Sequence, residues 1–236
     1  MSTTHINTNL KQVLQVLQVC DSTFPIGSFN HSYGMETYLR DSIITNATSL
    51  ERWLNIFLDN QFVHGEGLAV ALTYKYLGEN DIEKIWELDR LMTVQSVAKE
   101  GRDGAKLVSY RMSELMLNLY DINLLKKYQD KIKKELAFGS PAIVFAIVMW
   151  NLKISLKEAV TYYGYSVMAT LVQNAVRTIP LGQKDGQIIL NRLLNKLENI
   201  YTIISKLDEI DLGANIPGLE ISQINHEILT FRLFMS

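Results

Sequence analysis

The nine residues from Ala142 to Trp150, AIVFAIVMW, constrain the fold more than any other stretch of this sequence. They follow Ser140-Pro141, a pair typical of a helix start, because serine caps the first turn and proline has no N–H to lose there. A helix that is apolar all round has no face to offer to water. We therefore expect this helix at the centre of a helical bundle.

Apolar residues elsewhere recur with the i, i+3, i+4, i+7 spacing of a helix face. Leu10, Val13, Leu14 and Leu17 show this spacing, and similar stripes run through residues 50–58, 82–92, 124–132 and 188–197. No alternating strand pattern of useful length, hairpin dipeptide or internal repeat is present. The sequence predicts an all-α, single-domain helical bundle of about ten helices joined by short loops.

Helix starts are indicated by capping residues. Thr48 with Glu51, and Ser155 with Glu158, have the spacing of a capping box, in which each side chain accepts a hydrogen bond from the backbone N–H of the other residue. Asp81 and Asp121 are candidate single caps. We expect a helix to begin at each of these four positions.

The stretch from Gln173 to Leu190 predicts a sharp corner between two apolar helices. Pro180 should end the incoming helix near Ile179, because proline lacks an N–H and crowds the preceding turn. Gly182 and Gly186 should supply the backbone freedom for a tight reversal, with the helical pattern resuming at Gln187. A well-capped hairpin explains the turn, but a corner does not require the dense polar set of Arg177, Gln183, Lys184, Asp185 and Gln187.

Composition excludes several classes of partner. The 23 basic and 25 acidic residues give a net charge of -2, so the chain lacks the excess of positive charge that is typical of proteins that bind nucleic acid. One cysteine, Cys20, allows no disulfide within the chain, and the N-terminus does not resemble a secretion signal. The longest apolar run is shorter than the roughly 20 residues that cross a bilayer. We expect a cytoplasmic protein that binds neither nucleic acid nor membrane.

No constellation of side chains predicts catalysis. His5, His31, His64 and His226 lie far from one another in sequence, so no metal site of paired histidines is indicated. The pair His226-Glu227 is the best candidate for nickel, although a simple hydrogen bond explains it better. Glycine-rich phosphate loops are absent. We predict no catalytic residue, no metal site and no cofactor.

The chain ends in large apolar side chains, which are costly to leave in water. Phe231, Leu233, Phe234 and Met235 should therefore dock, either on the protein's own bundle or on another protein, and Arg232 adds an anchoring charge.

Three stretches, in order along the chain, carry a family resemblance. They are FPIGSFNHSYGMETYL (Phe24 to Leu39), AVRTIPLGQKDGQ (Ala175 to Gln187) and HEILTFRLFMS (His226 to Ser236). Together they resemble the signature of the urease accessory protein UreF family. The resemblance covers the beginning, the last third and the end of the chain.

The resemblance implies an all-α homodimer in the cytoplasm that acts as a urease maturation chaperone and not as an enzyme. It implies a complex with the accessory protein UreD (also called UreH) and the nickel-carrying GTPase UreG. In that complex, nickel reaches apo-urease under the control of GTP hydrolysis.

The resemblance also assigns candidate site residues. The N-terminal stretch is expected at the dimer or UreD/UreH contact, the corner at the surface that meets the GTPase or the dimer mate, and the C-terminal stretch at partner docking. The matching residues are Pro25, Gly27, Ser28, Phe29, Ser32, Tyr33, Gly34 and Glu36; Arg177, Pro180, Leu181, Gly182, Gln183, Gly186 and Gln187; and His226, Glu227, Arg232, Leu233 and Phe234. The expected organisation is a flexible end at 1–9, a helical domain at 10–220 and a partner-docking tail at 221–236.

Two alternatives stay open at this point. Arg177 or Gln183 could act on GTP in trans, which would make the protein a GTPase activator with an arginine finger. The chain could also be a helical interaction module unrelated to urease.

Overall fold

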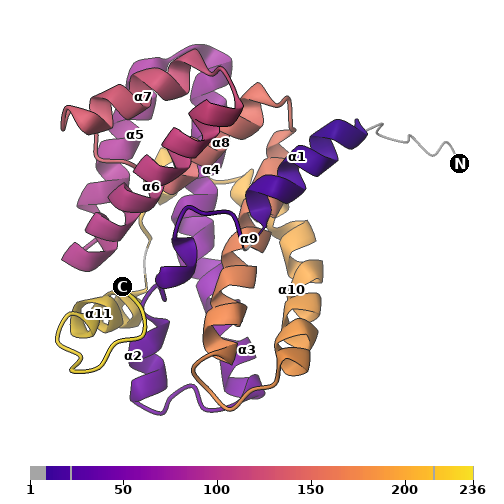
Figure 1. The fold of residues 1–236 in the computed structure, drawn as a ribbon, viewed down its shortest axis with the longest axis vertical. Coiled ribbons are helices and arrows are strands. Elements are labelled where there is room, and N and C mark those ends of the chain that lie inside the picture. The colour runs from indigo at the N-terminus through magenta and orange to yellow at the C-terminus, as the bar shows by residue number, and fades with distance from the viewer. Residues whose placement is uncertain (1–8, 22, 215, 236) are drawn as a thin grey trace, which may run out of the picture.

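The computed structural model describes residues 9–21, 23–214 and 216–235, and within these ranges it contains helices and no β-strand (Figure 1). The all-α prediction is therefore confirmed. The helices are α1 (Leu10–Cys20), α2 (Met35–Arg40), α3 (Ala47–Ile56), α4 (Glu66–Glu79), α5 (Ile82–Val94), α6 (Lys99–Leu119), α7 (Asn123–Lys133), α8 (Pro141–Asn151), α9 (Leu156–Val176), α10 (Gln183–Ile204) and α11 (Pro217–His226). Short 3-10 segments cover Ser28–Asn30 and Glu209–Asp211, and a π-helical segment covers Phe57–Phe62.

Helix α8 lies at the centre, as its sequence predicts. Every residue from Ala142 to Met149 is at most 2% exposed. Helices α4, α6, α7 and α9 surround α8 and cover all of its faces (Figure 1). Only at its end does Trp150 reach the surface, where its ring meets the edge of Tyr74.

Two of the four predicted helix starts are confirmed. Ser155 and Glu158 form the expected capping box at α9, and the Asp81 carboxylate accepts the Lys84 amide at α5. Helix α3 instead begins two residues early, because Asn46 and Ser49 make a capping box ahead of Thr48. Helix α7 begins after Ile122, so the expectation that Asp121 caps it is wrong.

The corner between α9 and α10 lies a few residues earlier in the chain than predicted. Helix α9 ends at Val176, and α10 begins at Gln183 and not at Gln187. The acidic side chain of Asp185 in the first turn favours this early start, because a negative charge complements the helix N-terminus.

The two corner glycines do not act as predicted. Gly182 has φ of -70° and Gly186 lies inside α10, so neither uses the left-handed region that glycine alone enters freely. A Cβ on Gly186 would lie 2.7 Å from Cγ2 of Val176. Gly186 therefore permits close packing of α10 on α9, and it is not a reversal point.

Helix α1 turns its predicted apolar stripe outward. Leu10, Leu14 and Leu17 are 58–72% exposed, whereas Val16 and Val19 are buried, and α9 is the helix that α1 packs on. The stripe is a true face of α1, but it is not the buried face.

Helix α6 runs unbroken through Gly101 and Gly104. Gly104 has a packing role, because a Cβ there would lie 2.5 Å from the His31 ring. His5 and the expected flexible end lie outside the described residues, apart from Asn9. Across the described part of the chain, none of the helices combines the length and hydropathy of a membrane span.

Candidate functional site

Two glycines shape the backbone of the N-terminal stretch, and one of them, Gly34, lies against α11. Gly27 and Gly34 have φ of 84° and 87°, a conformation that favours glycine. A Cβ on Gly34 would lie 2.5 Å from Oγ of Ser222 on α11. Gly34 therefore lets α11 pack directly on the start of α2 (Figure 1).

Glu36 on α2 is the centre of the contact. Its side chain is 1% exposed, and its two carboxylate oxygens accept bonds from the backbone N–H groups of Leu233 (2.8 Å) and Phe234 (3.1 Å). Nε2 of His226 lies 3.0 Å from Oε2 of Glu36. A buried carboxylate is costly unless it is hydrogen-bonded, and here three donors come from the last eleven residues of the chain.

His226 is fully buried between two carboxylates. Its Nδ1 lies 2.8 Å from Oε2 of Glu100, the second residue of α6. An ionised carboxylate only accepts hydrogen bonds, so a ring nitrogen that faces one needs a proton to form the bond. With a proton on each nitrogen, the imidazole donates to both carboxylates. His226 therefore joins α2 to α6 by way of α11.

Glu100 also binds Arg232, through a salt bridge to the guanidinium Nη1. Partial burial raises the pKa of Glu100, but the bonds from His226 and Arg232 outweigh it and hold the pKa below its usual range. Glu227 accepts the backbone N–H groups of Lys99 (2.8 Å) and Glu100 (3.3 Å). It thus caps the N-terminus of α6, whose own N-cap residue, Ala98, has no side chain able to do so.

The corner reaches this cluster through one side chain. The Arg177 guanidinium lies 5.9 Å from the centre of the Phe234 ring, within range of a cation–π contact, and Phe234 is 5% exposed. The remaining corner residues are not brought to Glu36. Pro180, Gly182, Gln183 and Gln187 are exposed, and Leu181 is half-buried.

Backbone contacts hold the end of the chain. Arg40 donates to the carbonyl of Phe231 (2.9 Å), and the Met235 N–H donates to the carbonyl of Asn30 (2.7 Å). Of the terminal apolar side chains, only that of Phe234 is buried on the bundle. Six others on α11 and beyond are 47–81% exposed, and we call them the C-terminal surface: Ile221, Ile224, Ile228, Phe231, Leu233 and Met235.

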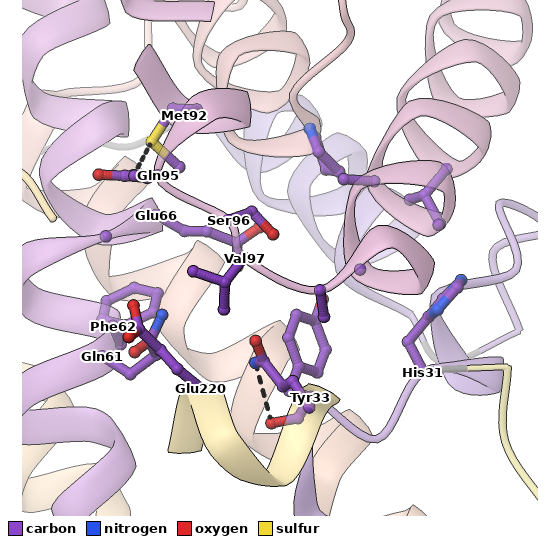
Figure 2. A pocket seen from close by; sticks show the side chains of 18 of the residues that line it. His31, Tyr33, Gln61, Phe62, Glu66, Met92, Gln95, Ser96, Val97 and Glu220 are labelled. Carbon is purple, nitrogen blue, oxygen red and sulfur yellow. Dashed lines mark hydrogen bonds between the residues drawn. The ribbon is translucent and has the colours of Figure 1, made fainter. Parts of the chain in front are cut away.

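A cavity of about 150 Å³ lies between the segment that precedes α2, the π segment, the α5–α6 linker, α6 and α11 (Figure 2). The ring of Tyr33 lines it, 6.0 Å from that of Phe57. Burial raises the pKa of Glu66 to about 7, although the hydrogen bond from Tyr163 (3.1 Å) acts in the opposite direction. Gln61 Oε1 is buried here without a hydrogen-bond partner.

The lining of the cavity includes two carboxylates, those of Glu66 and Glu220, and the imidazole of His31. Within the ranges that the structure describes, no group of three or more His, Cys, Asp and Glu side chains could hold a metal ion. His226, the best metal candidate from sequence, has both ring nitrogens directed at carboxylates. The hydrogen-bonding interpretation of His226 is the better one.

Residues of all three sequence stretches meet in the cluster around Glu36. The sequence model of the UreF family matches residues 44–194. The urease accessory protein UreF of Streptococcus thermophilus (strain LMD-9) is 47% identical over 230 residues, covering 98% of this chain and 97% of that protein. The chain belongs to the UreF family.

Other UreF proteins agree along almost the whole chain. That of Lachnoclostridium phytofermentans is 42% identical over 224 residues, covering 95% of this chain and 98% of the relative. That of Ureaplasma urealyticum is 39% identical over 237 residues, covering 98% and 99%. Family membership removes the alternative of a helical module unrelated to urease.

Sequence reasoning missed Glu100, Arg40 and Asn30. Glu100 lies in the first turn of a helix, where an acidic residue is ordinary because it complements the helix dipole. The Arg40 side chain donates to the backbone carbonyl of Phe231, and the backbone carbonyl of Asn30 accepts the N–H of Met235. Contacts to backbone groups require no particular residue type at the other end, so they leave no pattern in the sequence. No local signal was available to find these residues.

Proposed function

We propose that this UreF-family protein is a cytoplasmic urease maturation chaperone that acts as a scaffold and catalyses no reaction itself. With UreD/UreH and the GTPase UreG it promotes the delivery of nickel into apo-urease, and it works as a homodimer. The assignment of these partners rests on the family resemblance. The physical part of the proposal concerns the surface that meets them.

One observation carries this proposal: Glu36 draws the N-terminal and C-terminal stretches into one cluster, whose outer side is the C-terminal surface. The backbone of the segment after α11 is hydrogen-bonded to Glu36 of the same chain, whereas the side chains of Phe231 and Leu233 are 76% and 62% exposed. Large apolar side chains on an ordered backbone are what a protein interface uses as anchors. The segment is therefore suited to docking a partner.

A co-purification experiment tests the proposal. The chain is mixed with the UreD/UreH and UreG homologues, as wild type and as the double variant Phe231→Ser/Leu233→Ser. We expect the wild type to form a complex and the variant to lose it. The matched control is Ile210→Ser, which removes an apolar side chain that is 94% exposed outside this surface. A variant that assembles as well as the wild type would exclude the C-terminal surface from docking.

Modulation of the GTPase follows if the scaffold binds the GTP and GDP states with different affinities, because only that difference shifts the equilibrium. Exposed polar groups at the corner, Arg177 and Gln183, are candidates to supply the difference. Binding of UreG in both nucleotide states to the Arg177→Ala/Gln183→Ala variant tests this. Unchanged affinities in both states would remove these residues from the mechanism.

An arginine finger is the less supported alternative, because the Arg177 guanidinium already lies against Phe234. Single-turnover hydrolysis separates the two. A finger raises the rate by about 10³ or more, and a scaffold has no such requirement.

A further inference from the structure

The loop between α7 and α8, residues 134–140, is held by a buried acid on another helix. Asp89 of α5 is fully buried and accepts the N–H groups of Phe138 (2.7 Å) and Gly139 (3.0 Å). The Tyr128 hydroxyl donates to Asp89 and accepts the Ser140 N–H (2.9 Å). These bonds fix the backbone of three consecutive loop residues.

This fixed loop presents apolar side chains to solvent. Leu136 is 68% exposed and Phe138 is 44% exposed. The N–H of Phe138 is tied inward to Asp89 while much of its ring remains outside. Because the backbone is already ordered, a partner that covers these side chains meets little further cost in conformational entropy.

The helix that leads into the loop is strongly basic. Helix α7 has the sequence NLLKKYQDKIK, with four lysines and one aspartate and hence a net charge of +3, in a chain whose net charge is -2. Lys127, Lys131 and Lys134 follow the i, i+4, i+7 spacing of one helix face. Lys126, Lys127 and Lys134 are exposed, and no ion pair engages them in the part of the chain that the structure describes.

The other lysines near the loop already have partners. Lys131 lies over the Trp86 ring (5.3 Å), Lys133 over Tyr110 (5.8 Å), and Lys106 pairs with Glu135 (3.8 Å). Lys126, Lys127 and Lys134 are therefore the lysines of this region that have neither an ion pair nor an aromatic ring as partner in the described ranges. We call these three lysines, with Leu136 and Phe138, the α7–α8 knob.

We propose that the α7–α8 knob is a second docking surface, and that its partner is a protein presenting an apolar pocket rimmed by carboxylates. The apolar pair provides the anchor and the unpaired lysines provide charge complementarity, which fixes register and speeds association. Helix α7 lies at the top of Figure 1 and α11 in its lower half, so we expect the two surfaces to leave room for two partners.

A polyanion fits this surface less well. Asp121, Asp130 and Glu135 lie among the lysines, and two large apolar side chains lie beside them. Nucleic acid is bound chiefly through phosphate contacts, which this mixture weakens. A protein surface matches both the charge and the apolar pair.

The test rests on the proposed function, which supplies the probes: purified UreD/UreH, UreG and apo-urease. Each probe is titrated into the full chain alone, and then into the full chain already bound to the other two proteins. The apolar variant is Leu136→Ser/Phe138→Ser, with Ile210→Ser as its control. The charge variant is Lys126→Glu/Lys127→Glu/Lys134→Glu, with Lys157→Glu/Lys206→Glu as its control at two other exposed lysines. Circular dichroism and thermal unfolding establish that every variant is folded.

We expect both knob variants to weaken the binding of one component at least tenfold, and the control variants to bind as the wild type does. The wild-type affinity should fall as salt rises from 50 to 500 mM, and the charge variant should lose most of that dependence. The Phe231→Ser/Leu233→Ser variant should still bind the component that needs the knob.

Folded knob variants that bind every component like the wild type overturn the inference and leave the proposed function intact. A wild-type chain that binds no component overturns both. Two other outcomes also overturn the inference. In the first, the knob variants change only the self-association of the chain, measured by sedimentation, so the occupant is a second copy. In the second, the wild type binds a DNA duplex and the knob variants do not, while binding of the protein components is the same for both, so the occupant is a polyanion.

Discussion

Asp89 and Glu36 are both buried carboxylates that accept backbone N–H groups from an irregular segment, yet they hold different parts of the molecule. The donors to Asp89 come from Tyr128, Phe138 and Gly139, in the interior of the chain. The donors to Glu36 come from the last eleven residues. Asp89 holds the loop between α7 and α8, whereas Glu36 holds the segment that carries the C-terminal surface, so the same chemistry secures the body of the fold in one place and an exposed apolar surface in the other.

The largest effect should follow from Asp89→Ala. The change leaves two backbone N–H groups and the Tyr128 hydroxyl without their acceptor, and each buried unpaired group costs about 1–3 kcal/mol. We expect a loss of about 3–5 kcal/mol in the free energy of unfolding, measured in urea. The exposed acid Asp130, changed to alanine, is the control. A loss below about 1 kcal/mol would contradict the view that Asp89 belongs to the fold.

Glu36→Ala should cost less, about 2 kcal/mol, because the released N–H groups of Leu233 and Phe234 can bind water once the chain end detaches. Hydrogen exchange at these two N–H groups should accelerate strongly while exchange in α8 changes little. Glu114→Gln, an exposed acid on α6, serves as the control. If α8 and the chain end lose protection together, the distinction between the two carboxylates fails.

The corner can be assigned to the body or to the chain end by a pair of glycine variants. Gly186→Leu should destabilise by about 1–2 kcal/mol, because its Cβ would meet Val176 in a packed interface. In Gly182→Ala the new Cβ is 3.6 Å from its nearest neighbour, so stability should stay within about 0.5 kcal/mol. Exchange at Leu233 and Phe234 should be unchanged in both, and a change there would place the corner with the chain end.

A third carboxylate, that of the half-buried Glu66, sharpens the comparison because it accepts a hydrogen bond from a side chain, the Tyr163 hydroxyl (3.1 Å), and is protonated more readily. Its pKa in the folded protein is about 7, above the ordinary value of 4.5, so the folded state holds this proton more tightly than the unfolded chain does. Stability therefore rises as pH falls through 7 toward the ordinary range, by about 1 kcal/mol between pH 8 and pH 6. Glu66→Gln should abolish that slope in urea unfolding curves recorded across this range.

Glu100 should show the opposite sign. Its pKa lies below the ordinary range, so its contribution is present above that range and is lost as pH falls through the pKa of the folded state. Exchange at Leu233 should rise in acid before α8 unfolds. A parallel loss of protection at both places would contradict separate control of the chain end.

Much of the fold was predictable because its signals are local. The apolar run after Ser140-Pro141 required a central helix, and Ser155 with Glu158 marked the start of α9. The errors have local causes too: Asn46 precedes Thr48 and caps α3 first, and Asp185 favours an earlier start for α10. Helix α11 carries only a weak apolar pattern, and no helix was predicted there.

The site was predictable only in part. The family resemblance identified Glu36, Arg177, His226 and Phe234 as candidate site residues, and in the structure these four side chains lie in one cluster. It did not identify Glu100, which bonds to His226 across 126 positions of sequence. The roles of Pro25, Gln183 and Gln187 in binding partners stay predictions.

By itself the sequence determined which segments are helical and which helix is central, because capping and hydrophobic periodicity act over a few residues and need no distant neighbour. Tertiary structure alone decided that the N-terminal and C-terminal stretches meet at Glu36, and that Asp89 holds the loop from which Leu136 and Phe138 are exposed. The reason is physical: a buried carboxylate is stable only where the packed fold supplies its donors, and those donors come from far along the chain.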